Sequence, residues 1–220
     1  MKQVLFLILV FLLAFTSCKK DASNPTSPPN KPEIVSYAGK EYNTVKIGSQ
    51  TWLKENLDVG TMIQGSADPS NNTTIEKYCY DNNEANCGTY GGLYDWNEAM
   101  AYSTTAGTKG ICPTGWHIPI KAELETLKAT VGNDGNALKA VGQGTGSGVG
   151  TNTSGFSALL AGYRHVIGNF DDLGGYTLFW SSTEYSATNA YSMYLWHDDS
   201  NVNMYSSYKE DGFSIRCHKD

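Results

Sequence analysis

The sequence predicts an α+β domain in which helices come early and strands come late. Two segments, around residues 93–100 and 124–131, space apolar residues as on one side of a helix. From residue 155 onward the chain reads instead as a series of strands separated by turn residues. Glycine is abundant and only 17% of residues are charged, which favours a loop-rich extracytoplasmic domain over a helical bundle.

The N-terminus has the features of a bacterial lipoprotein signal. Residues 4–15 are apolar over about the length of a signal-peptide core, which is too short to span a membrane. Small polar residues then lead directly into Cys18, and this arrangement resembles the site at which such proteins are cleaved and acylated. An ordinary cleaved signal beside an accidental cysteine is the alternative. We expect residues 1–17 to be removed and Cys18 to carry lipid.

The segment after Cys18 is rich in Pro, Ser and Asn and holds few residues that a core could bury. Such composition does not offset the entropy lost on ordering, so we expect residues 18–40 to be a tether. Residues 41–220 then form the folded domain. These features predict an outer-membrane lipoprotein of the cell envelope, facing the periplasm or the surface and bound to the membrane through Cys18.

The charge balance argues against nucleic acid as a partner. The chain has 16 basic and 22 acidic residues, a net charge of −6, and its basic residues form no patch in the sequence.

Four cysteines remain once Cys18 is set aside, and an even number in an exported protein predicts two disulfides. Of the three possible pairings we predict Cys79–Cys87, which closes a short turn-rich loop, and Cys112–Cys217, which ties the middle of the domain to its last strand. Zinc is the alternative, but no two cysteines have CxxC spacing and no histidine lies at finger spacing from them.

The first predicted element is a hairpin over residues 42–53, with a turn at Gly48-Ser49. Residues 58–92 show no period and read as a long loop. Leu93, Trp96 and Met100 then form one apolar stripe of a predicted helix.

A second helix is predicted by the apolar stripe of Leu124, Leu127 and Val131. Glu123 stands where a capping-box glutamate would lie, but Ile120 replaces the expected Ser or Thr. The glycine-rich stretch at residues 139–155 fits neither GxGxxG nor a P-loop, so we expect a surface loop.

The strand predicted around residues 190–196 carries bulky residues on both faces. Tyr191, Met193 and Leu195 alternate with Ser192, Tyr194 and Trp196. This pattern is typical of a central strand that is covered on both sides.

Six blocks of the sequence resemble the Fibrobacter succinogenes major paralogous domain family of surface lipoproteins, in the family's order from Tyr42 to Asp220. The blocks are TVKIGSQTWLKENL, GGLYDWNEAM, CPTGWHIP, GFSALLAGYR, FWSSTEY and GFSIRCHKD. The resemblance implies a C-type-lectin-like fold, with two helices and a twisted antiparallel sheet closed by disulfides. It also implies surface display, but no defined activity. Ile120, Leu160 and Phe179 depart from the usual family residues.

The sequence predicts no enzyme and no catalytic residue. It contains neither GxSxG nor HExxH, and no pair of carboxylates is placed by spacing. His117 reads as a packing residue, and the other histidines have no partner visible in the sequence.

Binding of a glycan or a surface protein is the favoured function, because residues 176–208 are rich in aromatic rings, hydroxyls and carboxylates. A structural role in envelope assembly is the alternative, followed by an enzyme that acts on envelope polymers. The candidate ligand-binding residues are Trp180, Glu184, Tyr185, Trp196, Asp198, Asp199 and Tyr208. Most of these rings could equally belong to the core.

Calcium is the one cofactor that needs separate discussion. The sequence has none of the EPN, QPD or WND motifs of calcium-dependent lectins. The turn HDDSN offers Asp198, Asp199 and Asn201 as oxygen ligands, but such turns are common without metal. We therefore expect no cofactor.

Overall fold

The computed structural model describes residues 33–220 of the chain. The predicted signal peptide, Cys18 and most of the tether lie outside the described residues. Within this part of the chain, no helix has the length and apolar character needed to cross a membrane.

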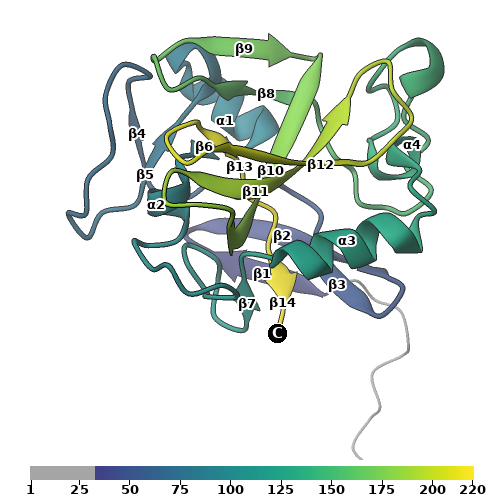
Figure 1. The fold of residues 1–220 in the computed structure, drawn as a ribbon, viewed down its shortest axis with the longest axis horizontal. Coiled ribbons are helices and arrows are strands. Elements are labelled where there is room, and N and C mark those ends of the chain that lie inside the picture. Colours follow the sequence, from purple (N-terminus) through teal and green to yellow (C-terminus); the bar gives the residue numbers. More distant parts are fainter. Residues whose placement is uncertain (1–32) are drawn as a thin grey trace, which may run out of the picture. The chain divides into compact units, whose positions relative to one another are not determined.

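Two sheets make up most of the fold (Figure 1). The five-stranded sheet, in spatial order, contains β1 (Ile34–Tyr37), β2 (Lys40–Ile47), β3 (Gln50–Leu53), β14 (His218–Lys219) and β7 (Trp116–His117). β1 is paired with β2, although its residues fall in the segment expected to be a tether.

The second sheet has nine strands. Its main path, in spatial order, contains β12 (Asn203–Tyr208), β11 (Asn189–Trp196), β10 (Tyr176–Glu184), β13 (Phe213–Ser214), β6 (Leu93–Tyr94), β5 (Glu76–Tyr78) and β4 (Thr61–Ile63). Off this path lie β8 (Ala161–Arg164), which pairs with β10, and β9 (Phe170–Leu173), which pairs with β8. The strand predicted around residues 190–196 is β11, which lies between β12 and β10 as expected for a central strand. It is not covered on both sides, because Trp196 on one face is 44% exposed.

The helices of residues 33–220 are short. They are α1 (Glu84–Tyr90), α2 (Trp96–Ala99), α3 (Lys121–Thr130) and α4 (Gly135–Leu138), with 3-10 turns η1 (Tyr80–Asn82) and η2 (Gly146–Gly148). The expected fold class was therefore wrong: the protein is mostly β and is not an α+β, C-type-lectin-like domain with two helices on one antiparallel sheet. The larger sheet is also mixed, because β4 and β5 pair in parallel.

The predicted helix at residues 93–100 explains most of this error. Leu93 lies in β6, and only the four residues of α2 are helical. Leu93, Trp96 and Met100 are all buried. A short strand followed by one helical turn can thus satisfy the same apolar spacing as a long helix.

Of the other local predictions, the hairpin and the helix around residues 124–131 were confirmed, and the loop at residues 58–92 was wrong. The hairpin of β2 and β3 pairs Ile47 with Gln50 around a two-residue turn, where Gly48 has φ +60°. α3 buries Leu124 and Leu127 as its stripe predicted. The segment at residues 58–92, predicted as a loop, instead contains β4, β5 and α1.

The core has two parts, and both disulfides adjoin it. One part joins the two sheets around Trp96, Trp180 and Phe213, and the other packs α3 against Trp52 and Phe179. The predicted pairs Cys79–Cys87 and Cys112–Cys217 are both present, and all four cysteines are buried. The second disulfide holds the chain just before β14 beside the segment that leads into β7.

Candidate functional site

The seven residues predicted to bind a ligand do not lie together. Trp180 is fully buried, its ring stacks on Phe213 with centroids 4.2 Å apart, and its Nε1 donates to the Tyr94 carbonyl at 2.9 Å. Its ring is therefore covered by the core, which is the alternative that the sequence left open.

Glu184 is held by an ion pair. Its Oε1 accepts from Lys209 Nζ, which also donates to the Ala187 carbonyl at 3.1 Å and lies 4.3 Å from the centre of the Trp96 ring. The neighbouring hydroxyls satisfy backbone groups: Ser182 Oγ accepts from the Gly107 amide at 2.9 Å. This end of β10 is thus occupied by interactions within the protein.

The turn after β11 uses its own oxygens. Asp199 accepts from the Asn201 amide at 3.0 Å and from the Asn203 side chain at 3.1 Å, and Asn201 Oδ1 accepts from Asn133 at 2.9 Å. The hydrogen bond from the Asn201 amide, with those from the two side chains, lowers the pKa of Asp199. Asp198 is exposed. Two of the three oxygen-bearing side chains considered for calcium therefore organise the turn itself.

Trp196, by contrast, belongs to a group of five rings on one face of the nine-stranded sheet. We call this group the aromatic surface, and its members are Tyr163, Tyr176, Tyr194, Trp196 and Tyr205. The Tyr176 ring is central: its centroid lies 5.1 Å from Trp196, 5.2 Å from Tyr194 and 6.1 Å from Tyr163.

Strand register explains how these rings meet. Tyr176 on β10 is directly opposite Trp196 on β11. Tyr205 on β12 is opposite Ser192, so it shares the face of Tyr194, its diagonal neighbour. Trp196 is 44% exposed and Tyr205 is 62% exposed, while the other three rings are partly buried beneath and beside them. The result is an accessible aromatic platform.

The polar groups of this surface are hydroxyls and carboxylates. Burial raises the pKa of Tyr176 and Tyr163, and the nearby charges of Asp171 and Asp172 raise that of Tyr163 further. Both phenols are therefore protonated at neutral pH and available as hydrogen-bond donors. Asp171 and Asp172 are exposed on β9, beside the rings.

The two remaining candidates lie elsewhere. Tyr208 is opposite Asn189, which places it on the other face of β12 from Tyr205. Tyr185 packs edge-on against Tyr191, with centroids 5.4 Å apart. Both Tyr185 and Tyr208 are 60% exposed. They form no continuous surface with Trp196.

A separate pocket of about 370 Å³ lies between β2, the chain after β3 and α1, and none of the predicted candidates lines it. Lys40 at its rim forms an ion pair with Asp58, which also binds Lys77. The buried Arg216 at this pocket donates to Asn56 Oδ1 and to two backbone carbonyls. Lys40, Asp58 and Arg216 are thus already engaged by other groups of the protein.

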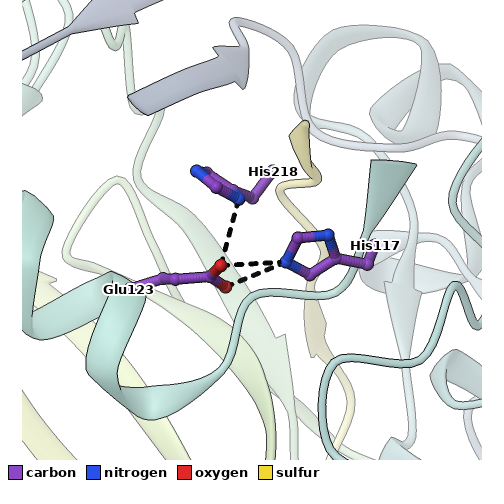
Figure 2. A group of neighbouring side chains, drawn as sticks. All are labelled: His117, Glu123 and His218. Atoms are coloured by element: carbon purple, nitrogen blue, oxygen red, sulfur yellow. Dashed lines mark hydrogen bonds and ion pairs between the residues drawn. The ribbon is translucent and has the colours of Figure 1, made fainter. Parts of the chain in front are cut away.

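The residues that could hold a metal are His117, Glu123 and His218, which we call the histidine cluster (Figure 2). His117 and His218 come from the paired strands β7 and β14, and Glu123 from the first turn of α3. Burial acts to raise the pKa of Glu123, but hydrogen bonds from His117 and the Ile120 amide, together with the nearby His218 ring, hold it below its usual range. Sequence reasoning missed this group.

Comparison with known proteins identifies one family. The family model described as the Fibrobacter succinogenes major domain matches residues 45–219. No curated protein and no solved structure matches the chain. The matched residues include the whole aromatic surface and the whole histidine cluster.

Proposed function

The chain belongs to the Fibrobacter succinogenes major domain family, and from this premise we propose that it is a lipid-anchored, non-catalytic envelope protein that binds a carbohydrate through the aromatic surface. The anchor is Cys18, which follows the apolar residues 4–15. The binding face is the platform around Trp196, Tyr176 and Tyr205.

The grouping of five rings on one sheet face is the observation that carries this proposal. Sugar rings have an apolar face that stacks on aromatic side chains, and hydroxyl edges that need donors and acceptors. Trp196 and Tyr205 offer exposed ring area, and Tyr176 offers a protonated phenol. Asp171 and Asp172 add acceptors at the edge of the surface. Contiguous apolar patches on a protein surface often mark interaction sites.

β12 itself supplies a matched control. Tyr205 and Tyr208 are 62% and 60% exposed, but they lie on opposite faces of the same strand. The full chain, purified in detergent, is applied to a glycan array in calcium and again in chelator. For any glycan that binds, Tyr205→Ala and Trp196→Ala should each weaken affinity about tenfold or more, as for aromatic residues at the centre of an interface. Tyr208→Ala should leave it unchanged.

Two outcomes would contradict this proposal. Folded protein that binds no glycan with or without calcium would contradict the proposal. Equal losses of affinity in Tyr205→Ala and Tyr208→Ala would contradict the assignment of the binding face. If crosslinking in intact cells instead captures a fixed stoichiometric protein partner at Trp196, the role is structural envelope assembly.

A further inference from the structure

The histidine cluster is assembled by three elements that are distant in the sequence. β14 pairs with β7 so that His218 lies directly opposite His117. Glu123 reaches the same point from the first turn of α3, and Figure 2 shows its carboxylate facing both rings. One ligand atom from each of the three residues lies within 4.8 Å of the others.

His117 has the environment of a metal ligand. Its Nε2 lies 2.9 Å from Glu123 Oε2, and its Nδ1 lies 2.7 Å from Asp220 Oδ1. Histidines that bind metals characteristically donate their other ring N–H to a carboxylate, which fixes the ring and the tautomer. Asp220 stands in that position.

His218 is the residue that interactions within the protein leave unexplained. Its side chain is 12% exposed, yet neither ring nitrogen has a hydrogen-bond partner among residues 33–220. Nδ1 lies 3.3 Å from Glu123 Oε1 but forms no hydrogen bond with it. Buried polar atoms are normally paired, so the unpaired His218 ring indicates that a ligand or ion binds here.

Two neighbouring side chains show the same deficit. Trp52 packs against the His218 ring with centroids 4.8 Å apart, and Gln50 Nε2 donates to the Glu123 carbonyl at 3.0 Å. Trp52 Nε1 and Gln50 Oε1 are both buried without a partner in the described part of the chain. An ion pair between His117 and Glu123 alone leaves both ring nitrogens of His218 without a partner.

We propose that His117 Nε2, His218 Nδ1 and a carboxylate oxygen of Glu123 bind a divalent transition-metal ion, with Asp220 orienting His117. Two imidazoles and one carboxylate suit Zn²⁺ and similar ions, whereas Mg²⁺ and Ca²⁺ prefer oxygen ligands alone. Tetrahedral Zn²⁺ with bonds of about 2.0–2.2 Å needs ligand atoms about 3.3–3.6 Å apart. His117 Nε2 and His218 Nδ1 lie 3.1 Å and 3.3 Å from the same oxygen, Glu123 Oε1, which is close to that spacing.

The remaining coordination position falls to water, because the three side chains are 12% to 23% exposed. Binding requires His117 to be neutral, so the ion displaces any proton shared with Glu123. The ion would connect β7, β14 and α3 beside the Cys112–Cys217 disulfide. The site is separate from the aromatic surface, so it does not depend on carbohydrate binding.

The test uses the full chain in detergent, stripped of metal with chelator and then exchanged into chelator-free buffer. Calorimetric titration should show one Zn²⁺ per chain, with no comparable binding of Mg²⁺ or Ca²⁺. Zn²⁺ should also raise the melting temperature, because it binds the folded state. His218→Gln should weaken affinity at least tenfold, and Asp220→Asn about tenfold, as for a residue that orients a ligand. His165→Gln, on a surface turn outside the cluster, should leave affinity unchanged.

A second measurement needs no variant. X-ray absorption of the zinc-loaded wild type should show only nitrogen and oxygen neighbours at about 2.0–2.2 Å. A sulfur shell at about 2.3 Å would place the ion on a cysteine and overturn the proposal. So would the absence of Zn²⁺ binding, or equal affinity in wild type and folded His218→Gln.

Discussion

Glu123 and Asp95 each accept a backbone hydrogen bond at the start of a helix, but their surroundings shift the two pKa values in opposite directions. Each accepts a backbone amide in the first turn of a helix: Glu123 from Ile120 at 2.9 Å, and Asp95 from Glu98 at 2.7 Å. Burial acts to raise the pKa of Glu123, but hydrogen bonds from His117 and Ile120, together with the nearby His218 ring, outweigh it and lower that pKa. Burial raises the pKa of Asp95 to about 7, and the negative Glu98 adds to this.

The difference arises from what the sheets bring to each carboxylate. β7 and β14 place two imidazoles beside Glu123, and one of them comes from 95 residues away in the sequence. Asp95 sits at the end of β6, where its close acidic neighbour is on its own helix. A capping pattern in the sequence therefore predicts the hydrogen bond between a carboxylate and the backbone, but it does not predict the protonation state of that carboxylate. Glu123 is held as an anion suited to a cation, whereas Asp95 keeps its proton until the pH approaches about 7.

Removing the Cys112–Cys217 disulfide should have the largest effect, because that bond holds β14 beside β7. Its cysteines are 105 residues apart, so the double substitution to Ser should lower the free energy of unfolding by about 4–5 kcal/mol. The matched double substitution at Cys79 and Cys87, which are 8 residues apart, should lower it by about 2–3 kcal/mol. Urea denaturation without reductant measures both, and equal losses would contradict this ranking.

Asp95→Asn should stabilise the protein at alkaline pH. With a folded pKa of about 7 against a reference of 3.8, the folded state keeps a proton that the unfolded state releases. Stability therefore falls as the pH rises from 3.8 to about 7, and stays low above that. Asn still accepts from the Glu98 amide, so the variant should gain about 2 kcal/mol at pH 8 and almost nothing at pH 3.5. Denaturation at the two pH values tests this, and a gain that is the same at both would refute it.

Glu123→Gln should act with the opposite sign. Its lowered folded pKa means that the carboxylate stabilises the fold above its reference pKa of 4.5, and that this stabilisation is lost as the pH falls through the folded pKa. In chelator at pH 7 the variant should lose about 1–2 kcal/mol, a figure reduced for a side chain that is 23% exposed.

Glu125→Gln is the control for that experiment. Glu125 pairs with Lys121 on the exposed side of α3 and is 49% exposed. Its substitution should cost no more than about 0.5 kcal/mol. If Glu125→Gln and Glu123→Gln destabilised equally, the histidines would contribute nothing to the charge of Glu123.

The sequence predicted the features that depend on local patterns. The hairpin at residues 42–53, the apolar stripe of α3 and both disulfide pairs were confirmed. The fold class was wrong because nearly every residue from 93 to 100 is buried. Apolar residues in such a segment can fall at helical spacing although most of the segment is not a helix. The short strands β4 and β5 were missed because each has only three residues, too few to show alternation.

The candidate sites depended on register, which the sequence did not supply. Trp196 was predicted, but the pairing of β10 with β11 was needed to place Tyr176 beside it. One disulfide predicted from the sequence does point toward the histidine cluster. The predicted Cys112–Cys217 bond already places residue 218 near the chain that follows residue 112, and hence near His117.

The starts of α2 and α3 also differ in how they are capped, and this difference has the smallest expected effect on stability. α2 is capped by its own Asp95, but Ile120 has no side-chain acceptor. Thr183 on β10 replaces it, because its Oγ1 accepts from the Lys121 amide at 3.0 Å. Thr183→Val keeps the shape and removes the acceptor, so it should cost about 1 kcal/mol. Thr104→Val, at an exposed loop position, should change the melting temperature little. An equally small change in Thr183→Val would show that water caps α3 as well as this distant hydroxyl does.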